Sequence, residues 1–404
     1  MNNASMKQVW ILTAVVALYG FGNGMMVTGA PQASIALHQP SDALGFIGAA
    51  LPMGYALSCL LCGQLFRRIA GKYVLLSGVA CACLSILSMS QAKTVGACVA
   101  SQVCFGLSGG AFWPFASSWM IDFESDGIPK TRLLRHYNLA WTSGTASGLF
   151  FAGLVCQQGY ITGNFYGAAA MMSVVFVCAC IPRAIQPHAK TEEGADAKPA
   201  RHTEPLGLAL FAAALLANVA ALGTRAVIVN NYAELNKHWG FGADRMGLFT
   251  AMMILSQLTA FSLGNLYESR LGLRRLYVFI AVSLVIVNIS FAYCTDLIVL
   301  VPAVMLHGVV LAVAFQAGII AGLGFFASPR TATTVHEAVV GMAGVAALIA
   351  GIIVVSLKHP GGVEVEALRA PFLWLALMAG VILAVQTVLV SVQTQPRLLL
   401  RGRS

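Results

Sequence analysis

The chain contains twelve separate apolar segments, each about as long as a helix needs to cross a lipid bilayer. A hydrocarbon core about 30 Å thick requires about 20 apolar residues per helix. The runs are continuous rather than alternating, and a bilayer admits only helices or a closed barrel, so strands are a poor alternative. The segments begin near Val9, Leu44, Tyr73, Val95, Leu139, Thr162, Leu206, Leu248, Leu276, Ile298, Ala338 and Pro371.

The composition also indicates that the chain is surrounded by lipid. Hydrophobic residues make up 58% of the 404 residues and charged residues only 10%, which excludes a water-soluble globule. We therefore predict an all-α integral membrane protein. The ten cysteines lie almost wholly inside apolar segments and lack the partner clusters of a zinc site, so we interpret them as buried, reduced side chains and expect neither a metal nor a cofactor.

The distribution of Lys and Arg predicts the orientation. If the amino terminus is cytoplasmic, eighteen of the 24 cations fall on that side of the membrane. This imbalance predicts that both termini are cytoplasmic, and we expect a plasma (bacterial inner) membrane. The net charge of +9 then faces anionic lipid and does not require nucleic acid as a partner. The remaining cations are Lys93, Arg225, Lys237, Arg245, Lys358 and Arg369.

One long polar interruption divides the chain. Residues 183–205 have the charge, proline and alanine content of a solvated linker. We predict a six-helix bundle over residues 1–182, a cytoplasmic linker over 183–205, a second six-helix bundle over 206–393 and a cytoplasmic tail over 394–404.

An internal repeat indicates that the two bundles are copies of one unit. The string GQLFRRIAG, residues 63–71, returns as GNLYESRLG, residues 264–272, and each copy closes a long apolar stretch. Glycine suits a tight turn between spanning helices, because it tolerates backbone angles and close approaches that a side chain forbids.

Two pseudo-symmetric six-helix bundles, a short linker and a glycine-framed basic loop after the second and eighth spans resemble the major facilitator superfamily of secondary transporters. The resemblance covers nearly the whole chain. It implies that the loop residues hold one conformation closed on the cytoplasmic side, although Arg67 stands where the family places an acid in the first copy. The matching residues are Gly63, Arg68, Gly71, Gly264, Glu268, Arg270 and Gly272.

Polar side chains at membrane depth are candidates for solute binding, because each must be compensated there. Carriers of this type bind their solute near the midplane between the halves. The alternative is that Asn and Gln simply bond across helices, which contributes about 1 kcal/mol each. The candidates by depth are Asn23, Tyr55, Asn218, Gln257 and His307 near the midplane, with Gln102 and Gln316 somewhat off it.

Arg225 is a further candidate for solute binding. It lies in the outer third of the seventh segment, and no acid precedes Glu234 in that segment. A cation at this depth needs an acid, lipid headgroups or a solute anion. The side chain is also long enough to snorkel to the membrane surface. Our hypothesis is that Arg225 contacts an anionic or zwitterionic solute.

The energy source is left open by the sequence. No acid lies at the middle of a predicted span, and Glu337 falls at the mouth of the eleventh. Gln102 precedes Gly106 where the family's proton-linked antiporters place an arginine. His307 is a possible proton carrier, because imidazole titrates in the physiological range. Facilitated diffusion or exchange fits equally well, and an interior this poor in acids disfavours organic cations.

Two tryptophans are candidates for a gate. Trp113, beside Pro114, and Trp141 could close the pathway toward the cytoplasm with apolar bulk. Tryptophan is also common at membrane interfaces, so the gate has a structural alternative.

The prediction is therefore a transporter, and not an enzyme, that moves a small polar solute by alternating access as a monomer in contact with membrane lipid. One alternative is an intramembrane serine protease, since GLSG at 106–109 and His307 nominally supply a nucleophile and a base. Another is a transporter-like sensor without flux. The sequence names neither the solute nor the direction of transport.

Overall fold

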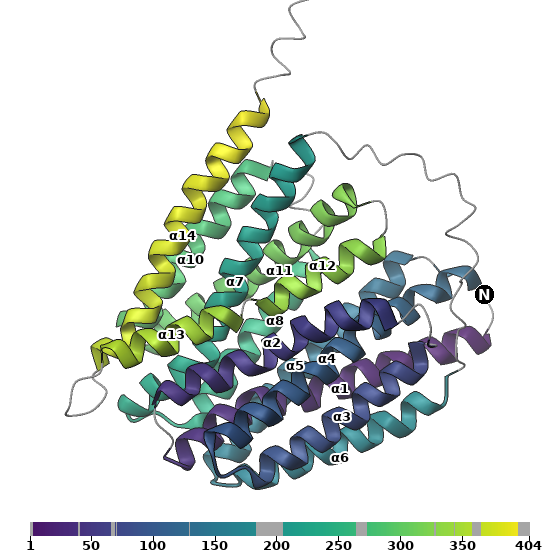
Figure 1. The fold of residues 1–404 in the computed structure, drawn as a ribbon, viewed down its shortest axis with the longest axis horizontal. Coiled ribbons are helices and arrows are strands. Elements are labelled where there is room, and N and C mark those ends of the chain that lie inside the picture. Colours follow the sequence, from purple (N-terminus) through teal and green to yellow (C-terminus); the bar gives the residue numbers. More distant parts are fainter. Residues whose placement is uncertain are drawn as a thin grey trace, which may run out of the picture.

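The structure is a computed structural model that describes residues 3–38, 41–65, 69, 71–128, 130–182, 205–263, 273–326, 329–342, 344–357 and 365–394. Within these ranges all regular secondary structure is helical (Figure 1). The helices of the first half are α1 (Asn3–Ala36), α2 (Ser41–Leu65), α3 (Gly71–Gln91), α4 (Val95–Asp122), the short η1 (Phe123–Asp126), α5 (Lys130–Gln157) and α6 (Ile161–Cys180).

The second half repeats this plan. Its helices are α7 (Pro205–His238), α8 (Ala243–Ser262), α10 (Leu273–Tyr293), α11 (Leu297–Phe325), α12 (Pro329–Met342), α13 (Gly344–Ser356) and α14 (Val365–Thr394). A single apolar span, Thr334–Val354, runs through α12 and α13. With α12 and α13 counted as one, the described helices longer than a single turn number six in each half, as predicted.

The outer surface is largely apolar, as expected for a protein that is surrounded by lipid. Among the described residues, ten helical stretches are long and apolar enough to cross a membrane, and α2 adds a shorter apolar stretch, Gly45–Leu61. Large apolar side chains point outward, for example Leu84, Val177 and Leu377, which are 69%, 64% and 67% exposed. Such exposure stabilises a protein whose surroundings are hydrocarbon rather than water.

Each half has its own hydrophobic core. In the first half, Leu12, Phe112 and Phe165 belong to one buried cluster drawn from α1 to α6. In the second half, Phe249 and Phe372 belong to another, which also takes in two residues of α5. Figure 1 shows the purple and blue helices of the first bundle lying at an angle to α7, α10 and α14 of the second.

Helix ends define two faces of the molecule. At the start of α3, Lys72 Nζ donates hydrogen bonds to the carbonyl oxygens of Cys180 and Pro182, at 2.5 and 2.7 Å, just where α6 ends. We call this side, where α1 also begins, the terminal face. At the opposite face α5 ends and α8 begins, and there the Gln157 Oε1 atom accepts a hydrogen bond of 2.7 Å from the Ala243 backbone N–H.

Glycines let α1 and α5 pack backbone to backbone. A Cβ atom added at Gly144 would lie 2.0 Å from the Ala17 carbonyl oxygen, and one added at Gly148 would lie 2.0 Å from that of Phe21. Small residues permit such approach where no hydrophobic effect drives helices together.

We expect Gly148→Ala to destabilise the first bundle by about 1–3 kcal/mol, because the added methyl group meets backbone atoms that cannot rotate away. Thermal unfolding of the purified protein in detergent measures the effect. The matched control is Gly380→Ala in α14, where an added Cβ atom meets nothing within 4 Å. Equal unfolding temperatures for the two variants would contradict this account of the packing.

The repeated loops are only partly described. Gly63 lies inside α2 and Gly71 is the first residue of α3, so these two glycines flank the connection rather than form its turn. Most other residues of the two motifs, and the predicted linker and tail apart from Pro205 and Thr394, lie outside the described residues: Arg68, Gly264, Glu268, Arg270 and Gly272 among them.

Candidate solute-binding cavity

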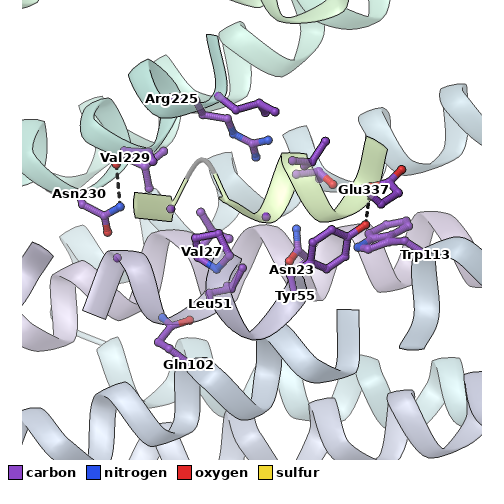
Figure 2. A pocket seen from close by; sticks show the side chains of 18 of the residues that line it. Asn23, Val27, Leu51, Tyr55, Gln102, Trp113, Arg225, Val229, Asn230 and Glu337 are labelled. Carbon is purple, nitrogen blue, oxygen red and sulfur yellow. Dashed lines mark hydrogen bonds between the residues drawn. The ribbon is translucent and has the colours of Figure 1, made fainter. Parts of the chain in front are cut away.

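A cavity of about 260 Å³ lies between the two bundles. Nine helices contribute to its wall, four from the first bundle and five from the second. The lining residues include Asn23 (α1), Tyr55 (α2), Gln102 (α4), Trp141 (α5), Arg225 (α7), Gln257 (α8), Phe315 (α11), Glu337 (α12) and Gly344 (α13). Figure 2 shows the polar side chains that converge on it.

Five of the eight predicted solute-binding residues line this cavity: Asn23, Tyr55, Gln102, Arg225 and Gln257. Several polar atoms in the wall are buried without a hydrogen-bond partner among the described residues. They are Oε1 of Gln102, Oε1 of Gln257 and Oγ1 of Thr145. Buried polar groups are normally hydrogen-bonded, so these atoms are unsatisfied acceptors within the wall.

Arg225 projects into the cavity from α7 (Figure 2). Its guanidinium group forms no ion pair with any residue that the structure describes. An unpaired cation inside a membrane protein is costly unless something compensates it. The cavity therefore carries a positive charge that a bound anion can neutralise.

Three predicted residues are not brought to the cavity: Asn218, His307 and Gln316 do not line it. Asn218 instead donates hydrogen bonds to the carbonyl oxygens of Ala214 and Ala314, at 3.0 and 2.6 Å, and so ties α7 to α11. His307 is fully buried. Counting from the segment ends predicts only depth, and it does not predict which face of a helix turns toward the cavity.

Glu337 is a cavity residue that counting depth along the sequence did not select. It was expected at the mouth of its span, because the apolar run begins near Ala338. In the structure α12 begins at Pro329, and the Glu337 side chain lies on the cavity wall. Its Oε2 atom accepts a hydrogen bond of 2.6 Å from the Tyr55 hydroxyl of α2 (Figure 2). The interior is therefore not free of acids, and the argument against organic cations no longer holds.

Aromatic side chains form the part of the wall toward the terminal face. Trp113 and Trp141 both line the cavity, and their ring centroids are 6.4 Å apart. Trp141 also contacts Phe261 of α8, at 6.3 Å between centroids, which joins the two bundles through aromatic rings. This position is consistent with the gate, which stays a prediction.

The protease alternative finds no support in the arrangement of Ser108. Its hydroxyl donates to the Phe105 carbonyl oxygen at 2.6 Å and lies 3.1 Å from the Tyr19 hydroxyl. Neither ring nitrogen of His307 has a hydrogen-bond partner among the described residues. A serine nucleophile needs a base within hydrogen-bond reach, and this pair does not supply one.

Two apposed helical bundles with a polar cavity between them are the architecture of a secondary transporter. Residues 12–357 match the sequence model of the Major Facilitator Superfamily. The chain belongs to this family.

Solved structures show the same fold. A mutant form of the nucleoside transporter NupG superposes with a TM-score of 0.79 at 12% identity, over 95% of this chain and 99% of that one. A bacterial homologue of the human lysosomal transporter Spinster, inward-facing and unoccupied, superposes with a TM-score of 0.73 at 12% identity, over 96% and 97%. None of the curated proteins matches the sequence significantly.

Proposed function

We propose that this protein is a secondary active or facilitative transporter that carries a small polar solute, anionic or zwitterionic, through the central cavity by alternating access. The observation that carries the proposal is Arg225, a cation that faces the cavity without an ion pair among the described residues. Two amides, Gln102 and Gln257, add unpaired oxygen atoms to the same wall. A solute with an anionic group and hydrogen-bond donors complements both features.

Nucleosides belong in the panel of test solutes, because NupG is a nucleoside transporter. Identities of 12–13% support the common fold only, so the solute class rests on the cavity. A thermal-shift screen of the purified protein against metabolites selects candidates, because a ligand stabilises the state that it binds.

Counterflow in proteoliposomes then tests the transporter itself. Vesicles loaded with an unlabelled solute are expected to accumulate the labelled solute transiently. Specific binding without counterflow would instead support a sensor. Proteolysis that is lost in Ser108→Ala would support an intramembrane protease.

We further propose that the terminal face is cytoplasmic and that the membrane is a plasma (bacterial inner) membrane. We also propose that the protein works as a monomer of two bundles, residues 1–182 and 206–393, which are joined by the linker 183–205. The excess of Lys and Arg on the side where both termini are expected supports this orientation.

Two native cysteines provide a test of orientation. Cys180 ends α6 at the terminal face, whereas Cys294 follows α10 at the opposite face. A membrane-impermeant maleimide added to intact cells is expected to label Cys294 and to spare Cys180, with both labelled after permeabilisation. Mass spectrometry of tryptic peptides distinguishes the two sites. The reverse pattern would invert the proposed topology.

A further inference from the structure

The carboxyl group of Glu337 lacks a cationic partner. Its one described hydrogen bond comes from a neutral phenol, the Tyr55 hydroxyl. No ion pair joins Glu337 to any described Lys, Arg or His. A carboxylate at membrane depth must be compensated, and one phenol leaves most of its acceptor capacity unused.

The carboxyl group of Glu337 shares the cavity with several aromatic rings. Tyr55, Trp113, Tyr137 and Trp141 all line the same cavity, and Figure 2 shows Trp113 next to the hydrogen bond between Tyr55 and Glu337. Tyr137 lies within electrostatic reach of Glu337, and its hydroxyl donates to the Trp113 carbonyl oxygen at 3.4 Å. The ring centroids of Trp113 and Tyr137 are 6.4 Å apart.

This combination of groups suits an organic cation. Faces of tryptophan and tyrosine rings attract ammonium groups, most strongly where water is excluded. A carboxylate among such rings adds a full opposite charge. A neutral donor could form a hydrogen bond to the carboxylate but would leave its charge in place, and an anionic group would be repelled.

The cavity also contains a positive charge, on Arg225, in addition to the negative charge of Glu337. Arg225 comes from α7 and Glu337 from α12, and both line the cavity. Arg225 and Glu337 do not form an ion pair with each other. Each charge is therefore available to a group of opposite sign, and a solute that carries both signs can pair with both.

We propose that Glu337, together with Tyr55, Trp113 and Tyr137, forms an ammonium-binding subsite, so that the solute is a zwitterion whose cationic nitrogen binds there and whose anionic group binds Arg225. The inference rests on the proposed function in that it assigns the solute class of the same cavity.

The test is equilibrium binding to the purified full-length protein in detergent, with probe pairs that differ only in charge. One pair is glycine betaine and tert-butylacetate, in which carbon replaces the quaternary nitrogen. Two further pairs are choline with its carbon analogue and γ-aminobutyrate with pentanoate. Isothermal titration calorimetry gives the affinities.

The wild-type protein is expected to bind at least one ammonium probe about tenfold more tightly than its uncharged counterpart, in line with a desolvated cation–aromatic contact. Glu337→Gln is expected to abolish that preference. This substitution keeps a side-chain oxygen for the Tyr55 hydroxyl, so the change removes charge rather than shape.

Two controls keep the result interpretable. Binding of tert-butylacetate to Glu337→Gln shows that the variant is folded and that the anion end of the cavity is intact. Glu366→Gln is the matched charge control, because Glu366 lies at the start of α14 with a side chain 74% exposed, outside the cavity wall. It is expected to keep the wild-type preference.

Three results would overturn the proposal. One is a wild-type protein without preference for any ammonium probe, and another is a preference that survives Glu337→Gln. The third is a Glu337→Gln variant that changes only the pH dependence of counterflow, which would make Glu337 a proton site. Binding is measured separately from transport. Ammonium binding without counterflow would refute the proposed transporter and support the subsite. Counterflow without a preference for ammonium probes would support the transporter and refute the subsite.

Discussion

Arg225→Gln should lower solute uptake by about two orders of magnitude while the protein still reaches the membrane. Removing one partner of a buried, charge-assisted contact costs about 3 kcal/mol, which corresponds to roughly 100-fold in affinity. Arg225→Lys should give an intermediate loss, because an ammonium group keeps the charge but not the planar fork that holds a carboxylate with two hydrogen bonds.

The thermal stability of Arg225→Gln, measured without solute, should rise rather than fall. In the empty protein Arg225 has no ion pair among the described residues, so its replacement by a neutral amide removes an uncompensated charge. Arg225→Gln without solute should therefore unfold at a higher temperature than the wild type. A residue that serves the fold alone would show the reverse.

The matched control is Arg275→Gln. Arg275 is exposed near the start of α10 and does not line the cavity, so its loss removes a positive charge without touching the site. Uptake and surface expression are measured for both variants in the same cells. Uptake by Arg225→Gln equal to that of Arg275→Gln would mean that Arg225 does not bind the solute.

The number and order of the spans could be predicted because the bilayer imposes the same requirement on each of them. Every crossing segment must satisfy its backbone internally and present about 20 apolar residues. An expected depth follows from the same reasoning, and among the residues that it selects, Asn23, Tyr55 and Gln257 line the cavity. The face of the helix does not follow from depth, which is why Asn218 and His307 lie elsewhere.

Glu337 was not selected as a cavity residue because a run of polar residues hides the start of its helix. Threonines and His336 precede it, so the apolar segment seemed to begin only at Ala338. One signal in the sequence could have found it. Glu337, Gly341 and Gly344 are spaced as one face of a helix, and all three line the cavity.

The two bundles also contact each other near the opposite face, where α5 meets α8. There α5 and α8 approach so closely that a Cβ atom added at Gly247 would lie 2.7 Å from Gly153 Cα and 2.8 Å from the Leu149 carbonyl oxygen. The hydrogen bond from the Ala243 N–H to Gln157 lies at the same end of the two helices. If transport alternates access, we expect this contact to open in one half of the cycle.

Gly247→Val should therefore shift the protein toward the state open at the opposite face. Overpacking costs about 1–3 kcal/mol where α5 and α8 touch and nothing where they have separated, so the ratio of the two states should change by about 5- to 150-fold.

Cys156 reports that shift, because it is 7% exposed in this structure and lies one helical turn beyond Gly153, on the same side of α5. Its alkylation by an impermeant maleimide, followed by mass spectrometry, should rise about tenfold in Gly247→Val and stay unchanged in Gly380→Val, where an added Cβ atom meets nothing within 4 Å. Unchanged alkylation with a lowered unfolding temperature would instead show that α5 and α8 form a fixed contact. Alternating access would then have to open the cavity without separating these two helices.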